Sequence, residues 1–151
     1  MIQGVQVKQL KPHADERGYL MELLRSDDEV FAGFGQSYVA LNYPGVVRAW
    51  HYHLLQTDFF AAVKGMVKVV LYDNREGSPP RGQVEEHFLG EQNPTGLKIP
   101  VGVIHGYKTI GTEPSLLINF PDHLYNPASP DEYRLPWNSP EVPYDWAIKF
   151  K

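Results

Sequence analysis

The stretch DFFAAVKGMVKVVLYD, from Asp58 to Asp73, decides the fold class. Both halves are rich in aromatic and β-branched residues, which favour strands, and Lys64-Gly65 separates them as a short connection of the hairpin kind. Glycine and proline residues at short intervals bound five more runs of this composition. These runs are VQVKQL (5–10), YLMELL (19–24), QSYVALN (36–42), VEEHFL (84–89) and SLLINF (115–120). Many short strands bounded by turn residues predict an all-β sandwich or barrel.

One segment has the pattern of a helix. In SDDEVFAG (26–33), Ser26 and Glu29 stand at the spacing of a capping box, and acidic residues occupy the first turn. We therefore expect one short helix there. No internal repeat, low-complexity stretch or linker divides the chain, so residues 1–151 are expected to form a single domain.

The segment from Asn119 onward differs from the rest of the chain in composition. It is rich in proline and polar residues, yet it keeps large aromatic side chains that a disordered tail would lack. These side chains are Tyr125, Tyr133, Trp137, Tyr144 and Trp146. We expect an irregular, ordered C-terminal segment that lies over the barrel, with its rings as anchors.

Composition excludes several classes of protein. The formal net charge is -4 and no run of lysine or arginine occurs, so a nucleic-acid groove is not expected. The chain has no cysteine, which excludes disulfides and thiolate metal sites. The N-terminus lacks the apolar region of a secretory signal, and no run approaches the roughly 20 apolar residues of a membrane helix. We expect a cytoplasmic protein that does not engage the membrane.

A group of histidines stands beside these strands. His51 and His53 project from the same face of a strand, since side chains two residues apart point the same way. Asp58 opens the next strand and could return to face them, and His105 follows a turn at Pro100. Imidazole and carboxylate are the ligands of Zn, Fe, Mn and Ni sites. The sequence therefore suggests a divalent metal held by His51, His53, Asp58 and His105, with open positions for a substrate.

A second interpretation of these residues needs no metal. In it, His51 lines a pocket as a proton-transfer residue, while His53 and Asp58 pair only by a hydrogen bond. Histidine changes charge near neutral pH, so base and ligand roles compete for it. Both interpretations remain open at this point.

The spacing resembles the two motifs of the cupin superfamily. The first motif is matched by Gly45, His51, His53, Asp58 and Gly65, with aspartate in place of the usual glutamate. The second is matched by Pro100, Gly102 and His105, with Thr109 in place of an asparagine. The resemblance implies the cupin double-stranded β-helix, or jelly roll.

A longer resemblance, in order along nearly the whole chain, is to the dTDP-4-dehydrorhamnose 3,5-epimerase family, which is built on the same jelly roll. DERGYLME (15–22) resembles the DxRGxFxE opening of the family, and RAWHY (48–52) resembles its RGLHY. The remaining matches are Gln36, DNREGSP (73–79), IPVGVIHGY (99–107), YNP (125–127) and YDW (144–146). The resemblance implies an enzyme that removes a proton next to the ketone of a nucleotide-linked 4-keto-6-deoxy sugar and returns it on the opposite face. Such enzymes act in deoxysugar or surface-polysaccharide biosynthesis.

The resemblance also implies roles for single residues. His51 matches the catalytic base, and Arg48 matches the arginine that faces the sugar and its anionic intermediate. His105 matches a second pocket histidine, and Tyr125 matches a tyrosine near the sugar. The residues that match holders of the nucleotide diphosphate and base are Arg17, Glu22 and Gln36. The family needs no cofactor and forms dimers through N-terminal strands, so we expect a homodimer with VQVKQL as a candidate pairing strand.

The chain departs from the family at its catalytic partners. Asp58 stands where the family has a lysine, and His53 stands where it usually has glutamine. The tyrosine that acts as general acid in the family aligns with Ile118 or Asn119. The aspartate that orients the catalytic histidine in the family aligns near Ser139. A metal at the histidine cluster would replace the charge of the lysine, but His51 bound to it could not also be the base, so a metal-bound hydroxide or Tyr125 would move the proton. Without a metal, Asp58 would orient His51 or His53. The alternatives to an epimerase are a metal-dependent cupin, as isomerase or dioxygenase, and a sugar-nucleotide-binding protein without catalysis.

Overall fold

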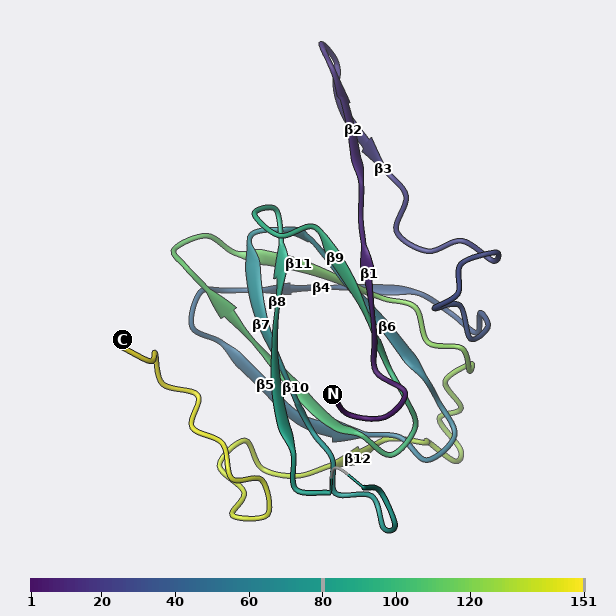
Figure 1. Ribbon diagram of the computed structural model, residues 1–151, viewed down its shortest axis with the longest axis vertical. Helices are drawn as coiled ribbons and strands as arrows, with labels where there is room; N and C mark the ends of the chain where they lie inside the picture. Colours follow the sequence, from purple (N-terminus) through teal and green to yellow (C-terminus); the bar gives the residue numbers. More distant parts are fainter. Residues whose placement is uncertain (80, 151) are drawn as a thin grey trace.

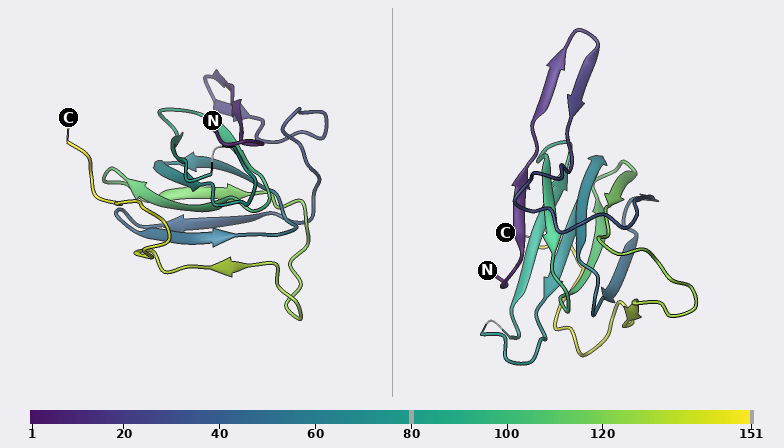
Figure 2. Two further views of the ribbon diagram at one scale, coloured as in Figure 1. Left: turned by 60° about the horizontal axis from the view of Figure 1, so that its bottom comes forward. Right: turned by 90° about the vertical axis from the view of Figure 1, so that its right-hand side faces the viewer.

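The computed structural model describes residues 1–79 and 81–150, and over these residues the chain forms twelve strands and no helix. Ten strands form two five-stranded antiparallel sheets that face each other (Figure 1; Figure 2). The expected all-β jelly roll is confirmed. Within the described ranges there is also no helix that could span a membrane.

Each sheet combines strands that are far apart in the sequence. The first sheet has the order β1 (Gln6–Gln9), β9 (Thr95–Ile99), β6 (Asp58–Lys64), β11 (Ser115–Asn119) and β4 (Tyr38–Asn42). The second has the order β12 (Tyr133–Arg134), β5 (Val47–Tyr52), β10 (Ile104–Ile110), β7 (Met66–Tyr72) and β8 (Val84–Gly90). The chain crosses repeatedly between the sheets, as a jelly roll requires.

The expected hairpin at Lys64-Gly65 is wrong. β6 pairs with β9 and β11 in the first sheet, whereas β7 pairs with β8 and β10 in the second. Gly65 therefore carries the chain between sheets, with φ at +63° and the carbonyl oxygen of Pro114 2.6 Å from where a Cβ would stand. Any larger residue would clash at this corner.

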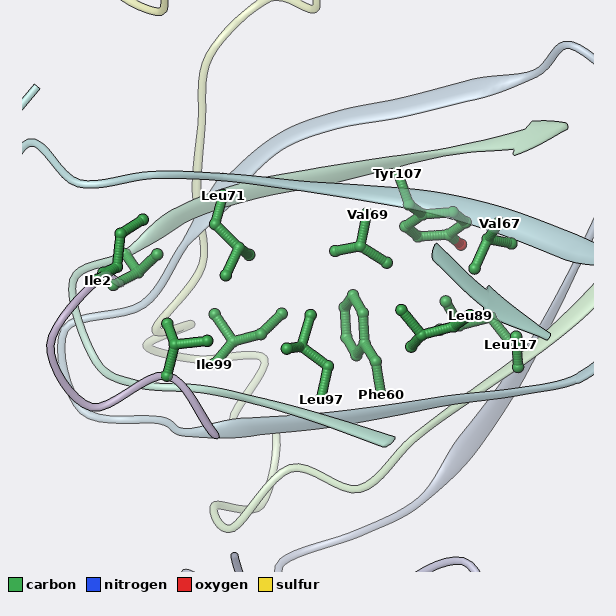
Figure 3. Packing of buried hydrophobic residues seen from close by; sticks show 13 residues of the cluster. Ile2, Phe60, Val67, Val69, Leu71, Leu89, Leu97, Ile99, Tyr107 and Leu117 are labelled. Atoms are coloured by element: carbon green, nitrogen blue, oxygen red, sulfur yellow. The ribbon is translucent and has the colours of Figure 1, made fainter. Parts of the chain in front are cut away.

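The main hydrophobic core lies between the two sheets. Figure 3 shows Phe60 and Leu97 of the first sheet packed opposite Val69, Leu71 and Tyr107 of the second. Each fully buried aliphatic side chain contributes about 1.5–3 kcal/mol to folding. The long apolar runs of β6 and β7 are buried because both strands lie in the middle of their sheets.

A two-stranded hairpin projects from this body. It consists of β2 (Pro12–Asp15) and β3 (Gly18–Met21), and Figure 1 shows it extending beyond the ends of the other strands. Nearly every residue of the hairpin is exposed, including Tyr19 and Leu20. An isolated two-stranded hairpin is marginally stable in water.

The expected short helix at residues 26–33 is wrong. The segment instead forms turns, in which Asp28 N donates to Arg25 O and Phe31 N donates to Asp28 O. The Asp28 carboxylate accepts a hydrogen bond from Arg25 N and forms an ion pair with Lys8 Nζ. Val30 is buried in a cluster with Leu10 and Phe59. These contacts with distant residues replace the helical arrangement that the local sequence favours.

The C-terminal segment is irregular and ordered, as expected. Over the part of this segment that the structure describes, the one strand after β11 is β12, which adds to the edge of the second sheet beside β5. Trp146 is buried against Trp50, and Tyr133 stacks on Tyr52 with 5.1 Å between ring centroids. Trp137 is largely exposed, so only some of the aromatic side chains serve as anchors.

Candidate functional site

A bulge in β5 brings two predicted site residues onto one face. His105 pairs with His51, but Tyr107 pairs with Arg48, so two steps along β10 correspond to three along β5. In a regular strand, residues three apart would point to opposite faces. The extra residue places Arg48 and His51 on the same side, and both line one cavity.

This cavity has a volume of about 730 Å³ and lies between the two sheets, beside the C-terminal segment. It brings together seven residues predicted from the sequence: Gln36, Arg48, His51, His53, Asp58, His105 and Tyr125. The volume falls in the range of pockets that hold small organic ligands. The lining combines aromatic rings with polar side chains, as such pockets usually do.

Two predicted residues do not line this cavity. Arg17 lies at the tip of the projecting hairpin, where its guanidinium pairs with Asp15. Glu22 follows β3 and pairs with Arg25 at 2.8 Å. Both are exposed.

His51 is half-buried in the wall of the cavity. Burial, followed by the neighbouring His105 and Arg134, lowers the pKa of His51 to about 4. The imidazole is therefore neutral at neutral pH, which is the form that accepts a proton. Arg134 is brought there by β12, in which it pairs directly with His51.

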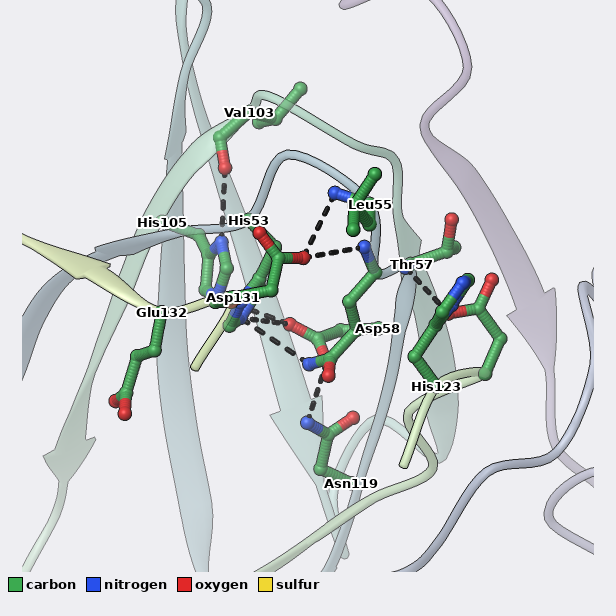
Figure 4. Close-up of polar contacts among 12 residues, drawn as sticks. His53, Leu55, Thr57, Asp58, Val103, His105, Asn119, His123, Asp131 and Glu132 are labelled. Atoms are coloured by element: carbon green, nitrogen blue, oxygen red, sulfur yellow. Dashed lines mark hydrogen bonds and ion pairs between the residues drawn. The ribbon is translucent and has the colours of Figure 1, made fainter. Parts of the chain in front are cut away.

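Three of the four predicted metal ligands converge on one point. Asp58 Oδ2 lies 3.2 Å from His53 Nε2 and 3.4 Å from His105 Nε2, as Figure 4 shows. All three side chains are largely or fully buried, and their atoms are placed to hold a metal ion. His51 lies outside this group, with its ring centroid 6.3 Å from that of His105. Asp58 thus contacts His53 and His105, and it does not orient His51.

The surroundings of this group fix its orientation. The second oxygen of Asp58, Oδ1, accepts hydrogen bonds from Gln56 Nε2 and Asn119 Nδ2, each at 2.8 Å. Burial raises the pKa of Asp58, but His53, His105 and Asn119 outweigh it and the pKa is lowered. Burial lowers the pKa of His105. Burial acts in the same direction on His53, but its bond to Asp58 prevails and raises the pKa.

Asp131 ties the C-terminal segment to the loop after β5. Its carboxylate accepts hydrogen bonds from the backbone N–H groups of Leu54, Leu55 and Gln56 at 2.8–2.9 Å. Its carbonyl oxygen accepts a hydrogen bond from His53 Nδ1. Nothing in the local sequence marks Asp131, because its partners lie more than 70 residues earlier.

Tyr38 is a further residue that the sequence reasoning missed. It lies on β4 opposite Asn119 of β11, and its hydroxyl accepts a hydrogen bond from Asn119 Nδ2 at 3.0 Å. Burial raises the pKa of Tyr38 to about 12, so the phenol stays protonated at neutral pH. The sequence feature that could have identified Tyr38 is its position two residues after Gln36, because strand residues two apart share a face. His123, which has no motif around it, also lines the cavity.

Arg48 reaches across the cavity from one sheet to the other. Its Nε donates to Asn42 Oδ1, and Asn42 Nδ2 donates to the Tyr107 hydroxyl at 3.2 Å. Asn42 is buried, so it holds the guanidinium at a fixed place on the cavity wall. The remaining donors of Arg48 are available to an anionic ligand.

Comparison with known proteins agrees with this geometry. The family model described as dTDP-4-dehydrorhamnose 3,5-epimerase matches residues 1–151. The chain belongs to this epimerase family. The resemblance seen in the sequence is thereby confirmed.

Three relatives place the chain within the epimerase family. It is 43% identical to the spore coat polysaccharide biosynthesis protein SpsL of Bacillus subtilis (strain 168), over all of both chains. It is 48% identical to the probable low-salt glycan biosynthesis epimerase Agl13 of Haloferax volcanii, over 96% of this chain and 94% of that protein. The crystal structure of a dTDP sugar isomerase from Desulfovibrio desulfuricans G20 superposes with a TM-score of 0.91 at 34% identity, covering 96% and 92% of the two chains.

The structure shows what surrounds the positions that differ from the epimerase family. Asp58, at the position of the lysine, is bound by two histidines and two amides. Asn119 is one of the two positions that match the general-acid tyrosine of the family, and its Nδ2 donates a hydrogen bond to the Tyr38 hydroxyl. Ser139 is buried next to Glu141 and does not line the cavity. The site thus keeps the histidine and the arginine that match the family motif but has different partners around them.

Proposed function

We propose that the protein is a sugar-nucleotide epimerase that acts on a dTDP-linked 4-keto-6-deoxy sugar. The observation that carries this proposal is the bulge in β5, which puts His51 and Arg48 on the same face of the strand, so that both line one cavity. A base and a fixed cation in one cavity are what proton removal beside a ketone requires.

His51 is the general base in this account. Its neutral imidazole removes the proton from the carbon next to the ketone, and the electron pair moves onto the ketone oxygen as an enolate. Arg48, held by Asn42, supplies positive charge to that oxygen or to the diphosphate. A preorganised charge lowers the barrier because it needs no rearrangement when the enolate forms.

The proton on the opposite face comes from a tyrosine. Three tyrosines line the cavity: Tyr107, which is buried beside Asn42, and Tyr38 and Tyr125, which are each about half exposed. Tyr38 is held by Asn119, one of the two positions that match the family tyrosine. We assign the donor role to Tyr38, because its hydroxyl accepts from Asn119 and so keeps its own hydrogen free for the ligand. Tyr125 then contacts the sugar.

We further propose a homodimer in which each hairpin reaches the partner's cavity. β1 lies at the edge of its sheet, and the β2–β3 hairpin carries exposed Tyr19 and Leu20 away from its own body. Arg17 and Glu22, which match nucleotide-binding residues of the family, lie on or beside this hairpin. Pairing across a twofold axis would bring them to the second cavity, where Arg17 suits a diphosphate.

The names of two relatives support a place for this activity in metabolism. SpsL is named for spore coat polysaccharide biosynthesis and Agl13 for glycan biosynthesis. Both match nearly the full length of this chain. We propose that the product is a deoxysugar nucleotide used to build a surface polysaccharide.

The proposal is tested by product formation from a dTDP-linked 4-keto-6-deoxy sugar, followed by NMR. Wild type should form the epimer, and His51→Asn should still bind dTDP but form no product. His87→Ala is the matched control, because His87 contacts Glu85 on β8 away from the cavity. Unchanged product formation by His51→Asn would remove His51 from the mechanism. Binding without any turnover by wild type would favour a non-catalytic sugar-nucleotide-binding protein.

A further inference from the structure

The group of His53, Asp58 and His105 has no role in the mechanism above. The three side chains come from different places: the loop after β5, the start of β6 and the start of β10. Asp58 and His105 are 1% and 4% exposed, and His53 borders the cavity at 13%. Ionisable groups buried to this degree need specific partners.

Both imidazoles are held in the same tautomer. His53 Nδ1 donates to the carbonyl oxygen of Asp131, and His105 Nδ1 donates to that of Val103 at 3.0 Å. With the hydrogen on Nδ1, each neutral ring presents the lone pair of its Nε2. Both Nε2 atoms point at Asp58 Oδ2, as Figure 4 shows.

The carboxylate adds a third electron-pair donor at the same point. Its Oδ1 is already bound by Gln56 and Asn119, so Oδ2 faces the two imidazoles. Gln56 Nε2 also lies 3.4 Å from His53 Nε2, which is long for a hydrogen bond. Three electron-pair donors that face one another repel unless a cation or a proton lies between them.

The distances fit a metal ion. Nitrogen and oxygen ligands lie about 2.0–2.2 Å from a zinc-sized ion, so two ligands of a tetrahedral site are about 3.3–3.5 Å apart. The measured separations are 3.2 and 3.4 Å. The two Nδ1 atoms donate hydrogen bonds to carbonyl oxygens, and the carboxylate accepts hydrogen bonds from two side-chain amides. Metal ligands usually have such hydrogen-bond partners.

We propose that His53, Asp58 and His105 bind one divalent transition-metal ion of the Zn, Mn, Fe or Ni type. Two imidazoles and one carboxylate suit these metals better than Mg or Ca, which prefer oxygen ligands. Three protein ligands leave at least one position of the metal open toward the cavity that His53 borders. The proposal concerns metal binding alone and stands apart from the epimerase assignment.

The test uses full-length protein without a polyhistidine tag, stripped with a chelator and titrated with Zn²⁺, Mn²⁺ and Co²⁺ by calorimetry. One site per chain is expected for at least one metal, and bound Co²⁺ should show visible absorption bands of a low-coordinate nitrogen–oxygen site. Asp58→Asn, which keeps the shape of the side chain, and His53→Gln should each weaken binding by on the order of 100-fold or more. Melting curves establish that these variants are folded.

Two variants serve as controls for the titration. His51→Ala removes a cavity histidine outside the group, and His87→Ala removes a histidine outside the cavity. Both should bind the metal like wild type. Absence of one-to-one binding in wild type, or equal binding by Asp58→Asn and His53→Gln, would overturn the proposal and leave a proton shared within the group. A protein that binds metal but does not turn over the sugar would keep this proposal while the epimerase assignment fails.

Discussion

The Trp146 ring lies on the fully buried Trp50 ring of β5, with 4.9 Å between their centroids. Trp50 Nε1 also donates to the carbonyl oxygen of Trp137 at 3.1 Å. One tryptophan of the second sheet therefore fastens the C-terminal segment at two points. That segment carries Tyr125, Asp131 and Arg134 to the cavity, so the site depends on this anchor.

Replacing the anchor should destabilise the whole protein. We expect Trp146→Ala to lower the free energy of unfolding by about 3–5 kcal/mol, because it leaves a large void against Trp50. Urea denaturation followed by circular dichroism measures this. Ile148→Ala is the control, since Ile148 is 72% exposed and its loss should have little effect. Equal stability of the two variants would mean that the C-terminal segment is not held as described.

Asp131 should control the order of the loop after β5. In Asp131→Ala the backbone N–H groups of Leu54, Leu55 and Gln56 lose their acceptor, so their amide hydrogens should exchange with solvent faster. The loss of charge-assisted bonds should cost about 1–3 kcal/mol. Hydrogen exchange followed by NMR or mass spectrometry reports on this loop directly. Glu132→Ala is the neighbouring control, and an unchanged loop in Asp131→Ala would contradict the assignment.

Asp73 should make the stability depend on pH in acid. The carboxylate is fully buried and accepts bonds from Arg75 and Ser78; burial raises its pKa, but these bonds prevail and lower it. A pKa below the unfolded value of about 3.9 stabilises the fold above that pH, and this contribution is lost as the pH falls through the folded pKa. Below about pH 4, the stability of Asp73→Asn should therefore fall less steeply than that of wild type. An equal fall in the melting temperatures of the two proteins between neutral and acidic pH would contradict this.

The proposed dimer predicts complementation between two inactive variants. Arg17→Ala lacks the hairpin residue, and His51→Asn lacks the base. If each hairpin serves the partner's cavity, a mixed dimer contains one site with both residues intact, so remixed protein should recover about a quarter of the wild-type activity. Turnover before and after mixing measures this, with light scattering to establish the dimer. No recovery on mixing would place Arg17 in its own chain's site or outside the site.

The sequence predicted those features of the fold that depend on local pattern. The seven apolar runs all contain strands, and the alternation of His51 and His53 places both on the cavity. Pairing partners were not predictable in this way. Lys64-Gly65 has the composition of a hairpin, yet it links two sheets, because β6 and β7 find their partners up to about 60 residues away. Asp28, likewise, pairs with Lys8 instead of lying in the first turn of a helix.

The site shows the same division between local and distant effects. Histidine spacing and family motifs identified His51, His53, Asp58 and His105, three of which converge. The bulge that puts Arg48 on the same face as His51 has no signature in the sequence, since it depends on how β5 pairs with β10. Asp131 reaches the loop after β5 only because the C-terminal segment folds back over the second sheet.

The central claim is that His51 removes a proton next to the ketone of a sugar nucleotide. The most direct measurement is deuterium incorporation at C3 and C5 of a dTDP-linked 4-keto-6-deoxy sugar in D₂O, followed by NMR. Wild type should incorporate deuterium at one or both carbons, and His51→Asn should do so at least about 100-fold more slowly. Tight binding of the sugar nucleotide by wild type, with no deuterium at either carbon, would contradict the account.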